Sequence, residues 1–281
     1  MTFVLAEVVK NIKTVVAKVN KMDNKVILIL VDGMRPDALI KCGNPFVKEL
    51  EKISTYTYNG KTVFPSITLP CHYSMTHSVP TDRHGILTNT FVPLARPMIG
   101  IFELLKNYGK RCGMYYTWEN LRDLYNPGAI DFSKYLSCHE ITDDRADTPI
   151  TDAALVDIEK YNPDFFFLYM GDPDNHGHMN GWMGEDYMYT VDNAVNNIKR
   201  VIEKFGDKYN YIILADHGGH DRMHGTDKPE DMTIPLYFIG KSFEKSKIID
   251  DISILDVAPT IADLFGIKKP SDWEGKSVLR R

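Results

Sequence analysis

A continuous apolar stretch, KVILILV over Lys25–Val31, ends directly at the dipeptide Asp32-Gly33. Four further short apolar runs follow it along the chain: Arg111–Thr117, Asp164–Met170, Tyr211–Ala215 and Pro235–Ile239. Runs that are apolar throughout, rather than at alternate positions, are typical of parallel strands that are covered on both faces. The sequence therefore predicts a central, mostly parallel sheet.

Helical patterns separate these predicted strands. The predicted helices cover Ile99–Tyr108, Thr148–Lys160, Tyr187–Phe205 and Ile254–Phe265. Strands that alternate with helices indicate an α/β fold, doubly wound, with helices on both faces of the sheet. Ligands of such folds bind outside the carboxyl ends of the strands, so function is sought in the residues that follow each strand.

The first 22 residues form a separate unit in this interpretation. Their apolar residues recur at helical spacing: Val4, Val8, Val9, Ile12, Val15, Val16 and Val19. This pattern predicts an amphipathic helix packed on the domain, with a helix that binds a partner or a membrane as the alternative. Residues 23–281 are then a single catalytic domain.

The composition excludes several classes of protein. Of 281 residues, 43% are hydrophobic and 25% are charged, which is typical of globular proteins rather than disordered or fibrous ones. The formal net charge of −5 offers no basic field for coating nucleic acid. No signal peptide is recognised, and no apolar stretch approaches the ~20 residues of a transmembrane segment. Four cysteines without a CxxC pair favour reduced thiols and a cytoplasmic protein, whose oligomeric state stays open.

Metal-type ligands are concentrated after three of the predicted strands. Asp32 follows the first, the segment Gly171–His178 follows another, and Asp216–Gly225 follows a third. Five of the nine histidines lie in the last two segments. Mixed Asp and His sites are those of zinc, or of manganese and iron. Two such ions about 4 Å apart are a common device for phosphoryl transfer.

A candidate nucleophile precedes a predicted helix start. Thr68 lies two residues before Pro70, a residue that suits the first turn of a helix. The free backbone N–H groups at the N-terminus of a helix attract a phosphoryl oxygen. The alternative is that Thr68 only caps the helix.

Together these motifs resemble, in order, those of the type I phosphodiesterase/nucleotide pyrophosphatase family of the alkaline phosphatase superfamily. The matching segments are Asp32-Gly33-Met34-Arg35, Thr68–Tyr73, His84–Asn89, Pro173–His178, Asp216-His217-Gly218 and His224-Gly225. The resemblance implies an alkaline phosphatase-like α/β/α sandwich. It also implies two divalent metal ions, expected to be Zn²⁺, with Mn²⁺ or Fe as alternatives.

The resemblance also assigns roles to residues. One metal ion would be held by Asp174, His178 and His224, and the other by Asp32, Asp216, His217 and the oxygen of Thr68. Thr68 would attack phosphorus and form a phosphothreonine-type intermediate. Asn89 and the backbone N–H of Leu69 would hold a non-bridging oxygen, and Tyr169 would stack on a nucleotide base.

Several positions depart from the family pattern. Leu69 stands where nucleotide-cleaving relatives usually have Phe, and Cys71 replaces the Asn of the segment. The short interval from His217 to His224 indicates a minimal cap. His220 is an alternative to His224, and His176 is an alternative to His178, although the spacing of the family favours His224 and His178.

These observations predict a hydrolase of phosphodiester or nucleotide pyrophosphate bonds in a small phosphorylated substrate. A phosphomonoesterase or phosphonate hydrolase of the same superfamily is the alternative. A monoesterase needs a cation for the second phosphate charge, and only Arg35 and Arg83 lie near the motifs. A sulfatase is not expected, because no Cys-x-Pro-x-Arg pattern is present. A phosphoglycerate mutase, which would need a Ser nucleophile and a large inserted domain, is not expected either. Since all the site residues are present, a binding module without activity is not expected.

Overall fold

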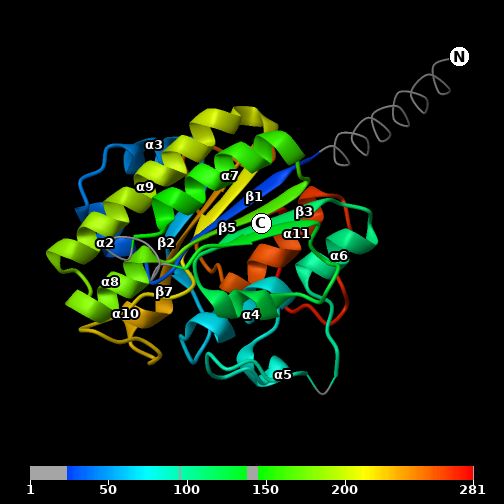
Figure 1. The fold of residues 1–281 in the computed structure, drawn as a ribbon, viewed down its shortest axis with the longest axis horizontal. Helices are drawn as coiled ribbons and strands as arrows, with labels where there is room; N and C mark the ends of the chain where they lie inside the picture. Colours follow the sequence, from blue (N-terminus) through cyan, green and yellow to red (C-terminus); the bar gives the residue numbers. More distant parts are fainter. Residues whose placement is uncertain (1–23, 95, 138–144, 281) are drawn as a thin grey trace, which may run out of the picture.

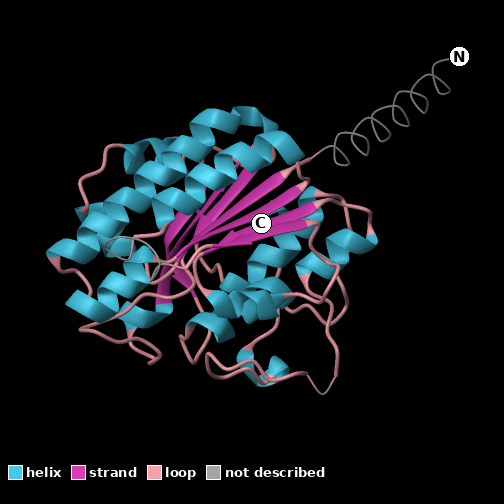
Figure 2. Ribbon diagram, viewed as in Figure 1, coloured by secondary structure: helices cyan, strands magenta, loops and turns pink. Residues whose placement is uncertain are grey.

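The computed structural model describes residues 24–94, 96–137 and 145–280. An eight-stranded sheet forms its centre, in the order β4-β3-β5-β1-β6-β7-β2-β8 (Figure 2). The strands are β1 (Val26–Val31), β2 (Thr55–Lys61), β3 (Cys112–Tyr116), β4 (Phe132–Tyr135), β5 (Phe165–Met170), β6 (Asn210–Leu214), β7 (Thr233–Ile239) and β8 (Lys247–Ile248). The predicted helix of residues 1–22 lies outside the described residues.

Strand β1 lies at the centre of the parallel part of the sheet. It pairs in parallel with β5 on one side and with β6 on the other. All six of its residues are buried, and so are all six of β5. Strands β3 and β4 extend the parallel part beyond β5. The predicted doubly wound, mostly parallel sheet is confirmed.

Strand β7 runs antiparallel to both of its neighbours, β6 and β2. The interpretation of its apolar run as a parallel strand is therefore wrong. A parallel neighbour needs a crossover of a dozen or more residues, usually a long helix. Between β6 and β7 the chain forms only one short helix, α10 (Pro229–Met232). Strand β7 therefore pairs beside β6 in the opposite direction.

Helices cover both faces of the sheet (Figure 1). One layer contains α2 (Pro36–Lys41), α3 (Phe46–Ile53), α7 (Asp147–Tyr161) and α9 (Glu185–Phe205). The other contains α4 (Thr68–His77), α6 (Ile101–Asn107) and α11 (Val257–Leu264). The shorter helices α5 (Thr81–His84) and α8 (Asp172–Asn180) lie toward the carboxyl ends of the strands. The four helices predicted from the sequence correspond to α6, α7, α9 and α11.

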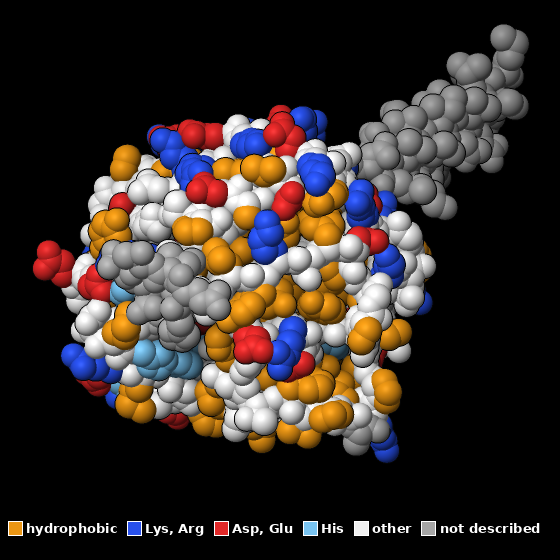
Figure 3. Space-filling model, viewed as in Figure 1, with side chains coloured by type: hydrophobic (Ala, Val, Ile, Leu, Met, Phe, Trp, Pro, Cys, Tyr) orange, Lys and Arg blue, Asp and Glu red, His pale blue; other side chains and the backbone are white. Residues whose placement is uncertain are grey.

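The surface carries charges of both signs. On the face shown in Figure 3, Lys and Arg side chains are interspersed with Asp and Glu. Within residues 24–94, 96–137 and 145–280, the structure contains no helix with both the length and the apolar character needed to cross a bilayer.

Candidate metal centre

The candidate site lies where β5, β1 and β6 end side by side. Asp32 directly follows β1, and Asp216 and His217 follow β6 by two and three residues. Asp174 lies in α8, which begins two residues after β5. Because these three strands are parallel neighbours, their carboxyl ends meet at one edge of the sheet. The topology therefore brings residues from three distant parts of the chain together.

One group of potential metal ligands consists of Asp32, Asp216 and His217. The Nε2 atom of His217 lies 3.2 Å from Oδ1 of Asp32 and 3.3 Å from Oδ2 of Asp216. All three side chains are buried. The sequence motifs placed these three residues on the same metal ion, and the structure brings them together.

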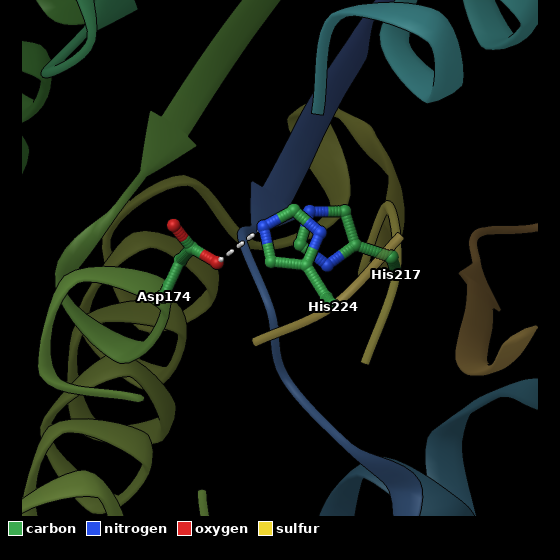
Figure 4. A group of neighbouring side chains, drawn as sticks. All are labelled: Asp174, His217 and His224. Atoms are coloured by element: carbon green, nitrogen blue, oxygen red, sulfur yellow. Dashed lines mark ion pairs between the residues drawn. The ribbon is translucent and has the colours of Figure 1, made fainter. Parts of the chain in front are cut away.

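A second group contains Asp174, His217 and His224 (Figure 4). The Nε2 atom of His224 lies 3.6 Å from Oδ1 of Asp174. His178, the remaining predicted ligand, has its Nε2 atom 3.6 Å from the other oxygen of Asp174. His217 thus belongs to both groups and joins them into one centre.

The alternative ligands His220 and His176 are directed to other acids. Nδ1 of His220 lies 2.7 Å from Oδ1 of Asp231, and Nδ1 of His176 lies close to Asp186. Neither histidine belongs to the two groups found among the described residues. The structure therefore brings His224 and His178, rather than these neighbours, to Asp174.

Three carboxylate oxygens of the centre are buried without a hydrogen-bond donor among the described residues. They are Oδ1 of Asp32, Oδ1 of Asp174 and Oδ2 of Asp216. A buried, uncompensated carboxylate is costly, so this donor set fits one or more cations. Carboxylate and imidazole together suit zinc, manganese or iron.

Burial has the largest effect on the pKa values of Asp32, Asp174 and His217. Burial, followed by the nearby Asp216 and Asp174, raises the pKa of Asp32 well above its ordinary value. Burial also raises the pKa of Asp174 to about 7. Burial lowers the pKa of His217 to about 3, which keeps this imidazole neutral, as a metal ligand must be.

Thr68 is the first residue of α4 and faces the centre. Its Oγ1 atom lies 3.2 Å from Nε2 of His217, and the side chain is only 4% exposed. The N-cap position of the helix belongs to Ile67, whose side chain makes no capping hydrogen bond. Because Thr68 lies inside the helix and its hydroxyl points to His217, the geometry does not support a role limited to capping.

Asn89 and the backbone N–H of Leu69, both predicted to hold a non-bridging oxygen, are hydrogen-bonded to each other. The backbone N–H of Leu69 donates to Oδ1 of Asn89 at 3.0 Å, so it is already occupied. The Leu69 side chain is fully buried, at 0% exposure. Asn89 itself lines the cavity above the centre.

Tyr169 lies at the same edge but offers little surface to a base. It is 2% exposed, and its hydroxyl donates to Oδ2 of Asp32. Burial, followed by the charge of Asp32, raises its pKa well above the ordinary value. The structure thus places Tyr169 against a potential metal ligand.

A cavity of about 310 Å³ opens over the centre and extends to β3 and β4. Its far wall contains Thr117, Trp118, Glu119 and Asn120, which follow β3, and Tyr135 at the end of β4. None of these residues is among the site residues predicted from the sequence. The predicted strand Arg111–Thr117 could have indicated the first four, because Thr117 ends it and the other three follow it, whereas β4 was not predicted.

Comparison with known proteins agrees with this arrangement. Residues 26–99 match the family model of the type I phosphodiesterase / nucleotide pyrophosphatase, and residues 132–269 match that of the metalloenzyme superfamily. The rat ectonucleotide pyrophosphatase/phosphodiesterase family member 1 (Rattus norvegicus) is 27% identical over 216 residues, or 68% of this chain and 24% of that protein. A 2,3-bisphosphoglycerate-independent phosphoglycerate mutase of Clostridioides difficile is 29% identical over 140 residues, covering 47% of this chain and 27% of the mutase.

The matches to these curated relatives span about a quarter of their length. Among solved structures, an inactive murine ectonucleotide pyrophosphatase / phosphodiesterase 5 in complex with AMP superposes with a TM-score of 0.75 and 14% identity. The superposition covers 88% of this chain and 96% of the murine one. From the two family models, the shared fold and the ordered motifs, we conclude that the chain belongs to the alkaline phosphatase superfamily.

Proposed function

We propose that the chain hydrolyses phosphodiester or nucleotide pyrophosphate bonds, with Thr68 as the nucleophile. The observation that carries the choice of a diester is the charge of the cavity. None of the described residues that line it is a lysine or an arginine. A monoester brings a second phosphate charge, which a cation in the cavity would have to neutralise. A phosphoryl group with two ester or anhydride substituents carries one charge at the reacting phosphorus and has no such need.

The two arginines nearest the motifs are engaged elsewhere. Arg35 donates from Nε to Asp37 at 2.9 Å and from Nη1 to the carbonyl of Gly219 at 3.0 Å. Arg83 donates from Nη1 to Glu274 at 2.7 Å, on the surface. These contacts support a diesterase rather than a monoesterase.

The proposed metal ions would occupy the two ligand groups described above. Asp174, His178 and His224 would hold one, and Asp32, Asp216, His217 and the Thr68 oxygen would hold the other. We propose zinc, which suits this donor set, as manganese and iron also do. Divalent ions supply electrostatic stabilisation of the charge that develops on phosphoryl oxygens.

The residues of the chain position the nucleophile and the phosphoryl group. The Nδ1–H of His217 donates to the carbonyl of Gly218 at 2.7 Å, so its Nε2 lone pair faces the Thr68 hydroxyl. Thr68 Oγ1 would form a bond to phosphorus while the bond to the leaving oxygen breaks, and the hydroxyl proton would pass through solvent to the leaving oxygen. Water would then cleave the phosphothreonine and restore the hydroxyl.

Asn89 is the proposed donor to a non-bridging oxygen. Its Oδ1 accepts from Leu69, which leaves its Nδ2 group available for the substrate. A donor of this kind stabilises charge that builds up in the transition state.

The organic part of the substrate would lie against the far wall of the cavity. Trp118 follows β3 and Tyr135 is the last residue of β4, and these strands lie one and two positions beyond β5 in the sheet. Neighbouring strands lie about 4.8 Å apart, so the two residues lie roughly 5–10 Å from the end of β5 along the edge of the sheet. This distance leaves room for a sugar between a phosphate at the metal centre and a base at the far wall. Aromatic rings at this distance support a nucleotide substrate, and a solved relative binds AMP.

A substrate panel tests the proposal. Zinc-loaded protein is assayed with bis(p-nitrophenyl) phosphate, p-nitrophenyl thymidine 5′-monophosphate, p-nitrophenyl phosphate and p-nitrophenyl phenylphosphonate. We expect the two diesters to have the highest kcat/KM, and the nucleotide diester to exceed the simple one. Higher kcat/KM for the monoester or the phosphonate would replace this proposal with the corresponding alternative.

A further inference from the structure

Trp182 lies at the point where the three ligand-bearing segments of the candidate centre meet. Its indole N–H donates to the carbonyl of Gly33 at 2.9 Å, and Gly33 directly follows the ligand Asp32. Its backbone N–H donates to the carbonyl of Asp221 at 2.8 Å, in the loop that leads to His224. The residue is 7% exposed. Trp182 itself follows β5, and its side-chain and backbone N–H groups bond it to the segments that follow β1 and β6 respectively.

Two glycines make room for the indole ring. A Cβ atom at Gly177 would lie 2.6 Å from Cε2 of Trp182, and one at Gly219 would lie 2.2 Å from the same atom. Neither distance is possible between real atoms, so any larger residue would displace the ring or the loop. Gly177 precedes the ligand His178, and Gly219 comes two residues after the ligand His217. The ring therefore lies directly against the backbone of both ligand loops.

The ring also contacts two of the potential ligands themselves. Its centroid lies 5.0 Å from that of His178, with planes at 85°, and 5.9 Å from that of His224, with planes at 65°. Both are edge-to-face contacts, a favoured arrangement of aromatic rings that packs the indole against each imidazole. Packing and hydrogen bonds around metal ligands of this kind set the affinity of a site.

We propose that Trp182 is a positioning residue that holds His178, His224 and the Gly33 turn in the geometry that binds metal. This inference rests on the proposed metal centre. Trp182 contacts no reacting atom in it. Its removal therefore weakens metal binding, while the bond-making residues stay unchanged.

Trp273 provides a matched control. It is 2% exposed, and its indole N–H donates to the carbonyl of Ile99 at 2.8 Å, so it is as buried and as well bonded as Trp182. The metal-free forms of Trp182→Phe and Trp273→Phe are titrated with zinc against a chromophoric chelator. Thermal unfolding of the same metal-free samples measures the structural cost of each change.

We expect both variants to lose thermal stability, but only Trp182→Phe to bind zinc at least tenfold more weakly than the parent. Equal zinc affinity in the two variants would overturn the positioning role. Failure of the parent to bind any zinc would instead contradict the proposed function, so the two failures are distinguishable.

A double-mutant cycle excludes a general loss of packing. Gly219→Ala alone forces the new methyl group against the indole, and we expect it to lower zinc affinity by a similar factor. In the Trp182→Leu background the methyl group meets a smaller side chain, so the same substitution should cost much less affinity. Effects that simply add would show that Gly219 and Trp182 do not act through this contact.

Fluorescence gives a readout that does not depend on activity. With Trp118 and Trp273 both replaced by Phe, Trp182 is the remaining tryptophan of the three in the chain. Zinc should change its emission with the same midpoint as the chelator titration, because the ring contacts two of the ligands. An emission that stays constant while zinc binds would contradict the proposed contact.

Discussion

The imidazole rings of His217 and His224 stack face to face, with centroids 3.8 Å apart and planes 13° apart. The family resemblance assigns these residues to two different metal ions. Burial lowers the pKa of His217 to about 3, so the His217 ring of this stack is neutral. His217 belongs to both ligand groups, so the stack lies at the junction of the two groups.

Removal of metal should lower the stability of the protein. Chelation leaves the buried carboxylate oxygens of Asp32, Asp174 and Asp216 without a cation. A ligand present at 1,000 times its Kd stabilises a protein by about 4 kcal/mol. We expect a marked fall in Tm and loss of hydrolysis after chelation, with both restored by zinc. Elemental analysis should find two ions per chain. A protein without transition metal, whose activity is indifferent to a strong chelator, would contradict the metal centre.

Substitution of His224 and His220 should have opposite consequences. His224→Ala removes a ligand, and we expect one metal equivalent to be lost. His220→Ala should keep both equivalents but lose about 1–3 kcal/mol, because it leaves Oδ1 of the buried Asp231 without its partner. Metal content and urea unfolding, measured on both variants, separate the two roles. Loss of metal from the His220 variant alone would reverse the assignment.

Thr68→Ala should abolish turnover and leave the fold intact. Since Thr68 makes no capping bond, we expect a stability change below about 1 kcal/mol, with kcat reduced by several orders of magnitude. Thr68→Ser should keep part of the activity, because it retains the attacking oxygen. Thr76→Ala, on the same helix, is the control: its hydroxyl donates to the carbonyl of His72, so its loss affects stability rather than chemistry. Near-normal diesterase activity in folded Thr68→Ala would rule out the nucleophile.

Asn89→Ala should have an intermediate effect on turnover. One lost donor to a non-bridging oxygen reduces kcat by about 10²–10³. The metal content should not change, because Asn89 belongs to neither ligand group. Comparison of single-turnover rates for the parent and the variant provides the measurement, and an unchanged rate would exclude the proposed contact.

Two buried histidines outside the metal centre should destabilise the protein in acid. Burial lowers the pKa of His77 to about 3 and that of His84 to about 4. Between these values and the ordinary pKa of about 6.5, the unfolded chain binds protons that the folded chain does not. The free energy of unfolding therefore falls as the pH falls below about 6.5, by about 1.4 kcal/mol per pH unit for each histidine.

The double variant His77→Phe, His84→Asn tests this dependence. Phe at position 77 retains an aromatic ring to stack on Tyr73. Asn at position 84 retains a hydrogen-bond acceptor for the backbone N–H of Ile86, which donates to Nδ1 of His84 in the parent. The difference in unfolding free energy between variant and parent, measured from pH 7 to pH 4.5, should shift in favour of the variant as the pH falls. A constant difference would contradict the assigned pKa directions.

The sequence predicted the centre of the fold better than its edges. Continuous apolar runs identify β1 and β5, because both faces of these strands are buried. Strand β4 was missed because its residues are half-buried or exposed, which leaves no continuous apolar run. An apolar run also carries no information about direction, so the antiparallel pairing of β7 could not be predicted from its residues.

The candidate site also contains residues that the sequence predicts and residues that only the folded chain identifies. Asp32, Asp174, Asp216 and His217 lie within four residues of the ends of three neighbouring strands, so the strand order brings them together. The partner of His220 is Asp231, and only the folded chain shows that this pair excludes His220 from the centre. Trp182 has no signature in the sequence, because its role depends on two glycines in separate loops.

Strand β1 lies between β5 and β6, and this order has a consequence for synthesis. Val26–Val31 leaves the ribosome long before either neighbour, since its partners are Phe165–Met170 and Asn210–Leu214. Until then, a fully apolar strand with two unpaired edges is exposed, and such segments promote aggregation. Charged Lys25 and Asp32 flank it on both sides and act as gatekeepers. We therefore expect nascent chains that end before β5 to depend on chaperones, and folding to become productive only after β6 has emerged.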